Sequence, residues 1–388
     1  MSGRILLKQA LPYAAVFMIL IGVTGGKAAL KVQEMGNSDM EEYIETSDKA
    51  LSNIQSEEKS DLTGTTASES IVTASDSTEK KYIKWVDFRV SAEALSKAYE
   101  LDVKSYENEV HLDWIELLAY LGAKYGGDFS RYSEKDILSA AEKIIENGGE
   151  IYELVKDMQY YEYYREAYGA VLSGMVGEYY VKEESEQEIT DEVLVKKYGI
   201  KAFSPISAGF YYNDYDDFGV SRSYGYKRKH LGHDMMGMTG TPIICVESGY
   251  VEAIGWNRYG GWRIGIRSLD KKRYYYYAHL RKDYPYNKLL KEGSYVNAGE
   301  VIGYLGRTGY SIRENVNNID TPHLHFGIQL IFDESQKEGN NEIWIDCYQI
   351  IKFLAKNRAS TYKTVSEGLN EWKSSTVYYE EQECYKEN

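Results

Sequence analysis

The apolar residues of this chain first follow a helical period. Residues 113–127 read DWIELLAYLGAKYGG. Apolar side chains recur there at i, i+3, i+4 and i+7, the spacing of one helix face: Trp114, Leu117, Leu118 and Leu121. Asp113 and Glu116 form a cap pair at the start, and Gly126 with Gly127 provides a stop. The segment therefore predicts an amphipathic helix.

A second segment repeats this pattern. Residues 133–149, SEKDILSAAEKIIENGG, run from Ser133 and Asp136 to Gly148 and Gly149, which again supplies a polar start and a glycine stop. We therefore expect a small helical domain over residues 82–183. The candidate roles of this domain are binding a protein partner, restraining the rest of the chain and acting as a spacer.

Short β-rich runs separated by glycines replace the helical period after about residue 200. Four such runs are GTPIICVESGYVEAIGW, GGWRIGIRSLDKKRYYYYAHL, EGSYVNAGEVIGYLGRTG and TPHLHFGIQL. Closely spaced strands with glycine turns predict an antiparallel sheet or sandwich, here over residues 200–360. We expect an α+β protein with a helical domain before a β-rich domain, and a C-terminal tail over residues 361–388.

The first 31 residues form a separate segment. Arg4 and Lys8 precede an uncharged run over residues 10–26 that is about long enough to span a membrane. The run is either a signal peptide or an uncleaved anchor. Gly26-Lys27-Ala28 is a poor cleavage site and no cysteine follows the run for lipid attachment, so an anchor is favoured.

Residues 32–80 are rich in Ser, Thr, Glu and Asp and contain hardly any aromatic residue. Such a composition cannot bury enough apolar surface to fold, so it predicts a disordered spacer. Basic residues before the apolar run and acidic ones after it favour a cytoplasmic N-terminus. The rest of the chain is then expected outside the cytoplasm, either on a single-pass anchor or secreted after signal cleavage.

Charge and cysteine content exclude two classes of function. The net charge is −15, whereas a nucleic-acid partner would need a basic face. The three cysteines, Cys245, Cys347 and Cys384, are too few and too scattered for a disulfide framework or a cysteine metal site. We expect no nucleic-acid partner and no disulfide.

Histidine is rare and concentrated in the β-rich region. Of the six histidines only His111 lies outside it; the others are His230, His233, His279, His323 and His325. In TPHLHF, His323 and His325 are two residues apart, so a strand would direct both imidazoles to one face and Leu324 to the other. One apolar face would pack and the histidine face would meet another group.

The segment KHLGHDM supplies a carboxylate of matching parity. In an extended chain His230 and Asp234 converge on one side, and Gly232 between them lets another group approach the backbone. His233 has the opposite parity and is expected to be a bystander. Two imidazoles and a carboxylate form a suitable ligand set for zinc, which keeps one position for water in catalytic sites.

Two further histidines are then available for proton transfer or for stabilising an oxyanion. The candidates from spacing alone are His279, in YYAHL, and one member of the HLH pair. The chain also contains framing segments around these histidines: GTPI, SGYV, VNAGEVIGYLGRTG and PHLHF.

These motifs resemble those of the lysostaphin-type or LytM-like zinc peptidases, which cut peptidoglycan peptides. That family carries H-x-x-x-D, then Y-x-H-L, then H-x-H, in the order found here over residues 205–330. The resemblance implies that zinc is bound by His230, Asp234 and His325. It further implies that His279 and His323 are the catalytic pair, in an order that spacing does not assign, and that the fold is the family's β-rich core.

One segment departs from the family pattern. Residues 310–320, YSIRENVNNID, are longer than the connection usual in the family, so this loop would alter or partly cover the groove. Tyr275 and Tyr277 share the parity of His279, so they either line the substrate groove or belong to an ordinary Tyr-rich strand, with Tyr277 the better groove candidate. Asn213 or a nearby Asp would either cap the zinc in a latent state or be an ordinary solvated side chain.

The favoured function is a membrane-tethered zinc endopeptidase that hydrolyses peptide bonds in peptidoglycan stem peptides or cross-bridges. The alternative from another class is a catalytically silent scaffold or activator of another hydrolase. All five site positions are intact, which favours the enzyme. An amidase that cuts between sugar and peptide is disfavoured by the H-x-H motif.

Overall fold

The computed structural model describes residues 82–184, 192–223, 227–337, 341–366 and 369–381. The chain divides into two compact units. One comprises Met1–Lys81 with Ser221–Lys229, and the other comprises Tyr82–Val220 with His230–Asn388. In the first unit the described residues form an antiparallel hairpin of β4 (Ser221–Ser223) and β5 (Lys227–Lys229).

Within the described ranges, no helix has both the length and the apolar character needed to cross a bilayer. The predicted anchor at residues 10–26 and the predicted spacer at residues 32–80 lie outside those ranges. Both therefore stay predictions.

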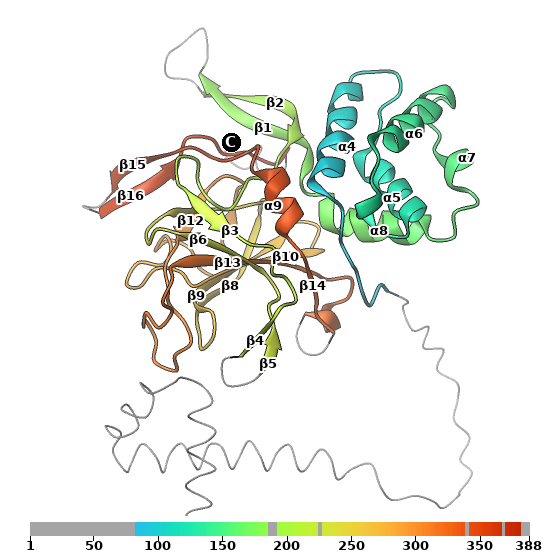
Figure 1. Ribbon diagram of the computed structural model, residues 1–388. Helices are drawn as coiled ribbons and strands as arrows, with labels where there is room; N and C mark the ends of the chain where they lie inside the picture. Colours follow the sequence, from blue (N-terminus) through green and yellow to red (C-terminus); the bar gives the residue numbers. More distant parts are fainter. Residues whose placement is uncertain (1–81, 185–191, 224–226, 338–340, 367–368, 382–388) are drawn as a thin grey trace, which may run out of the picture. The chain divides into compact units, whose positions relative to one another are not determined.

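The second unit begins with helices that pack on one another as a group (Figure 1). They are α4 (Ala92–Ser105), α5 (Trp114–Tyr125), the 3-10 turn η1 (Phe129–Arg131), α6 (Glu134–Glu146), α7 (Tyr152–Val155) and α8 (Tyr161–Leu172). The predicted helical region is confirmed over these spans. It ends earlier than expected, because residues 176–184 form a strand.

Helix α5 follows its sequence signals closely. The Asp113 carboxylate accepts hydrogen bonds from the backbone N–H groups of Ile115 and Glu116, and Gly126 ends the helix with φ 64°. The predicted apolar face is buried. In α6, by contrast, the Asp136 carboxylate accepts hydrogen bonds from Lys124 and Tyr125 of α5 instead of capping its own helix.

A long hairpin links the helices to the β-rich region. It pairs β1 (Val176–Glu184) with β2 (Glu192–Ile200) in antiparallel register. A buried ionic network also connects the two regions, since the Arg273 guanidinium donates to Glu247 and to the carbonyl of Ala170 at the end of α8. These contacts make the helical and β-rich regions parts of one compact unit.

The main sheet is antiparallel throughout and carries the candidate site. Its strand order is β11-β8-β9-β10-β13-β6-β3, with β14 also paired to β13. The strands are β3 (Tyr212–Asp214), β6 (His233–Gly237), β8 (Gly249–Asn257), β9 (Gly261–Ser268), β10 (Arg273–Ala278), β11 (Tyr295–Val296), β13 (His323–Leu330) and β14 (Ile343–Ile345). A second small sheet pairs β7 (Pro242–Ile244) with β12 (Val301–Tyr304). The predicted α+β class is confirmed.

The C-terminal region is more structured than the predicted tail. After η2 (Glu334–Gln336) and α9 (Tyr348–Leu354), strands β15 (Thr361–Ser366) and β16 (Leu369–Ser374) form a hairpin. Beyond it, Tyr379 exchanges backbone hydrogen bonds with Tyr180 of β1, and the Tyr378 N–H donates to the Ala298 carbonyl. The prediction of a tail from residue 361 was therefore wrong over the described residues, because this segment adds backbone pairing to the edge of β1. Cys245 and Cys347 are free and buried.

Candidate active site

Strand β13 positions two histidines by simple alternation. It lies between β10 and β6, and its Leu324 and Phe326 side chains are fully buried in the core. His323 and His325 therefore project from the opposite face, as the sequence predicted. The register places His325 directly opposite Asp234 of β6, so a carboxylate and an imidazole meet across neighbouring strands.

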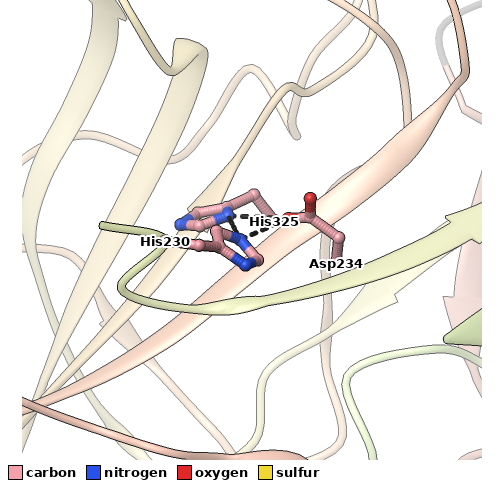
Figure 2. A group of neighbouring side chains, drawn as sticks. All are labelled: His230, Asp234 and His325. Carbon is pink, nitrogen blue, oxygen red and sulfur yellow. Dashed lines mark hydrogen bonds and ion pairs between the residues drawn. The ribbon is translucent and has the colours of Figure 1, made fainter. Parts of the chain in front are cut away.

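Three side chains converge at this point (Figure 2). His230 Nε2 lies 3.0 Å from Asp234 Oδ1 and 3.1 Å from His325 Nδ1, and His325 Nδ1 lies 2.8 Å from Asp234 Oδ1. Among the described residues, this trio is the group of His, Cys, Asp or Glu side chains whose ligand atoms lie within 4.8 Å of one another. Two imidazole nitrogens and one carboxylate oxygen facing one another fit a divalent transition metal.

Gly232 makes room for this arrangement. A Cβ atom at position 232 would lie 2.5 Å from His325 Cε1 and 2.8 Å from the Phe326 carbonyl oxygen. The group that approaches the backbone between His230 and Asp234 is therefore the His325 imidazole. The glycine is required by close approach, as its place in the sequence suggested.

A second carboxylate orients His230 from behind. Asp217 Oδ1 lies 3.0 Å from His230 Nδ1, so the ring's other nitrogen faces Asp234 and His325. A carboxylate on the remote nitrogen of an imidazole fixes its tautomer and strengthens it as a ligand. From the sequence, an Asp near Asn213 was expected only as a zinc cap or a solvated residue. The role of Asp217 in orienting His230 was missed, because no periodic pattern in the sequence indicates it.

The trio is arranged so that its carboxylate is ionised and His325 is neutral. Burial alone would raise the pKa of Asp234, but hydrogen bonds from His230 and then His325 lower that pKa well below its usual range. Burial lowers the pKa of His325, against the opposing effect of Asp234. A neutral imidazole and an ionised carboxylate are the forms that bind metals.

His279 lies just beyond the end of β10 in a left-handed conformation, with φ 62°. Its Nδ1 donates to the Thr308 carbonyl at 2.9 Å, so Nε2 is the nitrogen that carries the lone pair in the neutral ring. Burial lowers the pKa of His279 well below its usual value. A non-glycine residue at positive φ is costly and is often found where a side chain must be aimed at a reaction centre.

His323 is held in the same manner as His279. Its Nδ1 donates to the Thr321 carbonyl at 2.8 Å, and its Nε2 lies 3.7 Å from Asp234 Oδ2. The rings of His279 and His323 are 4.8 Å apart between centroids. The structure therefore brings all five predicted metal and catalytic side chains together, because the His279 ring also lies 5.8 Å from the His325 ring between centroids.

Tyr277 does not line a groove, and that prediction was wrong. Its ring is fully buried in the core, where its hydroxyl accepts a hydrogen bond from the Val246 N–H. The parity argument failed because His279 lies past the strand at positive φ, so it does not continue the alternation of β10. The residue of β10 that faces the site is Tyr276, whose ring lies 6.1 Å from that of His325.

The remaining candidates lie away from the trio. His233 Nε2 pairs with Asp214 Oδ2 at 2.9 Å, and its ring packs near Tyr348. Asn213 is exposed and its side chain donates to the Tyr215 hydroxyl, so it does not cap the trio. His111 belongs to the helical region, where it pairs with the buried Asp102 carboxylate.

Part of the β-rich region matches a known family. The matched residues are 228–339, and the family is Peptidase family M23. The chain contains a peptidase family M23 domain. The trio of His230, Asp234 and His325, together with His279 and His323, lies inside the matched residues, and the predicted family resemblance is confirmed.

Relatives of the M23 domain include proteins named as endopeptidases. Over 124 residues the chain is 39% identical to the L-Ala–D-Glu endopeptidase of Bacillus subtilis (strain 168). The aligned region covers 32% of this chain and 36% of that protein. Over 160 residues it is 30% identical to the glycyl-glycine endopeptidase ALE-1 of Staphylococcus capitis, which covers 41% of this chain and 39% of that protein. The chain thus spans less than half the length of these relatives.

Among solved structures, the M23 domain is similar to the catalytic domain of the antimicrobial peptidase lysostaphin from Staphylococcus simulans. The identity is 32%, the match covers 36% of this chain and 92% of that domain, and the TM-score is 0.28.

Proposed function

We propose that this protein is a zinc-dependent endopeptidase that hydrolyses peptide bonds of peptidoglycan. The observation that carries the proposal is the meeting of three metal-binding atoms with two further imidazoles. His230 Nε2, Asp234 Oδ1 and His325 Nδ1 face one another, and His279 and His323 flank them with their Nδ1 atoms already bonded. Metal-assisted hydrolysis uses both a metal site and nearby proton-transfer groups, whereas a structural metal site would not need the two further imidazoles.

Zinc fits the donor set of His230, Asp234 and His325. Three protein ligands of nitrogen and oxygen leave a coordination position open, which is typical of catalytic zinc sites. When bound, the ion would polarise the carbonyl of the scissile bond and make water a stronger acid. Asp217 would support the site by holding His230 in the tautomer that presents Nε2.

His279 and His323 supply groups that move or hold a proton. Because each Nδ1 donates to a backbone carbonyl, each neutral ring presents an unprotonated Nε2. Such a nitrogen accepts a proton from the attacking water and, once protonated, donates it to the leaving amine or to the oxyanion of the tetrahedral intermediate. The burial of His279 keeps it neutral before reaction, as a base must be.

The names of the relatives support the substrate class. The two relatives are named for different peptide bonds, L-Ala–D-Glu and glycyl-glycine. We place the activity outside the cytoplasm, with the residue 10–26 segment as a membrane anchor. The basic residues before that segment and the acidic ones after it support this orientation.

The test is digestion of purified peptidoglycan by the full chain, with and without a chelator, read as released fragments by mass spectrometry. We expect chelator-sensitive release of cut peptides, restored by zinc and absent in His323→Ala. His233→Ala is the matched control, since this histidine pairs with Asp214 and is not one of the five side chains of the candidate site. The fragments identify the bond.

Two other outcomes would overturn the proposal. Release of intact peptide from sugar would indicate an amidase. No release with zinc present would favour a scaffold or activator, and the complete set of five side chains would then need another explanation.

A further inference from the structure

We propose that Tyr310 is a positioning residue for His279, and that Asn315 and Asn318 hold its loop in place. Residues 310–320 form the loop that the family resemblance led us to expect to be longer than usual. The inference rests on the proposed function, because it gives this loop a role in aligning one of the two catalytic imidazoles.

The contact with His279 is the first observation. The Tyr310 and His279 rings are stacked, with centroids 5.8 Å apart and planes inclined by 29°. The backbone of His279 is fixed by donation from its N–H to the Gly260 carbonyl, and its ring is fixed at Nδ1 by the Thr308 carbonyl. The hydrogen bond fixes the position of Nδ1 but leaves the His279 ring free to tilt about that atom. A stacked aromatic ring restricts the tilt.

The backbone around Tyr310 is arranged to make this contact. Gly309 has φ 125° and Tyr310 has φ 48°, two successive residues in a region that L-amino acids rarely adopt. A Cβ atom at position 309 would lie 3.1 Å from His279 Nδ1 and 2.4 Å from the Tyr259 carbonyl oxygen. The chain therefore passes close beneath the imidazole and then turns Tyr310 onto its face. Such strain persists only where surrounding contacts maintain it.

The loop supplies those contacts. The Asn318 side-chain amide donates to the Tyr310 carbonyl at 2.8 Å, and the Tyr310 N–H donates to the Tyr259 carbonyl at 3.2 Å. The side-chain amide of Asn315 forms hydrogen bonds through both its oxygen and its nitrogen. Its Oδ1 accepts from Trp262 Nε1 at 2.9 Å and from the Asp283 N–H at 2.8 Å, and its Nδ2 donates to Asp283 Oδ1 at 2.6 Å.

These bonds tie the loop to two separate places in the fold. Trp262 belongs to β9, whereas Asp283 follows β10 after His279. The Trp256 indole N–H of β8 also donates to the Ser311 carbonyl at 3.3 Å. The loop is thus anchored to other parts of the fold, and Tyr310 at its start is held through both its N–H and its carbonyl.

A positioning role predicts a specific kinetic signature. Misaligning a catalytic group slows the chemical step without changing how substrate binds in the ground state. Replacing Tyr310 by Leu removes the stacking ring, and we expect kcat to fall about 10- to 100-fold with KM unchanged. Tyr310→Phe keeps the ring and should restore kcat to nearly the native value. Asn318→Ala should lower kcat in the same direction and by less.

The experiment measures kcat and KM of the zinc-loaded full chain on peptidoglycan fragments for these variants. Ile312→Ala is the matched control, because this exposed side chain lies in the same loop and makes none of the bonds described. An unchanged kcat in Tyr310→Leu, or an equal loss in Tyr310→Phe, would overturn the inference. The second result would assign the effect to the hydroxyl group instead of the ring.

A readout independent of turnover separates this inference from the proposed function. In the full chain with its six histidines isotopically labelled, the His279 ring protons, assigned with His279→Ala, should be shifted by the aromatic ring in NMR spectra. Tyr310→Leu should abolish that shift and Tyr310→Phe should keep it. A retained shift in Tyr310→Leu would overturn the inference, whereas an inactive wild-type chain with the expected shift pattern would overturn only the proposed function.

Discussion

The candidate site contains two kinds of histidine that are held in different ways. His230 and His325 both contact carboxylates: Asp217 lies behind His230 at Nδ1, and Asp234 lies beside His325 Nδ1 within the trio. His279 and His323 are oriented by backbone carbonyls, from Thr308 and Thr321. The first arrangement places carboxylate charge close to the imidazoles, which favours binding of a cation. The second fixes ring direction without adding a charge, which suits groups that must gain and lose a proton.

We propose that this difference separates two functions, metal binding by the first pair and proton transfer by the second. Asp234 contacts both members of the first pair and lies 3.7 Å from His323 Nε2, so this carboxylate would link the two functions. Changes to the carboxylates should therefore act on metal content, and changes to the other pair should act on turnover alone.

The largest effect is expected from Asp234→Asn. This change removes the charged ligand that lies within 3.0 Å of both His230 Nε2 and His325 Nδ1. Bound zinc, measured by elemental analysis after desalting, should fall from roughly one ion per chain to background, and peptide release should be lost. Stoichiometric zinc in this variant would show that the carboxylate is not a ligand.

Removing either backbone-held histidine should affect turnover and leave the metal in place. For His279→Ala and for His323→Ala we expect kcat to fall about 10²- to 10⁴-fold with zinc content unchanged, since each removes a proton-transfer group. The measurement combines elemental analysis with fragment release. Loss of zinc in either variant would erase the distinction between the two kinds of histidine.

The carboxylate behind His230 offers a finer comparison. Asp217→Asn should weaken zinc binding about 10- to 100-fold, because the imidazole loses its orienting partner, and activity should return when zinc is added. Asp214→Asn is the matched control, since Asp214 forms a similar pair with His233 away from the trio. Competition titration with a chelator measures both affinities, and equal weakening in the two variants would contradict the positioning role.

The smallest effect on activity is expected from Tyr277→Phe, two residues before His279. The change removes the hydroxyl that accepts from the buried Val246 N–H. It should lower the free energy of unfolding by about 1 to 3 kcal/mol and leave kcat unchanged. Chemical denaturation and fragment release test this prediction. A fall in kcat without a loss of stability would contradict it and would support a role for Tyr277 in the substrate groove.

Regular periodicity made much of this protein readable from its sequence. The i, i+3, i+4, i+7 spacing and the flanking Asp113 and Gly126 predicted α5, and both residues cap it as expected. Alternation in HLHF predicted the two faces of β13, and the burial of Leu324 and Phe326 confirms it. These predictions succeeded because local geometry repeats at a fixed period and an apolar face must be buried wherever it lies.

The tertiary structure decided what no period encodes. His279 leaves the alternation of β10 at positive φ, so the prediction for Tyr277 failed and Tyr276 faces the site instead. Asp217 reaches His230 from 13 residues upstream, and Tyr310 contacts His279 from a loop that is anchored elsewhere in the fold. The residue types available to the site were determined by the sequence alone. Which of them meet depends on strand register and loop path, because those bring together side chains that no local pattern relates.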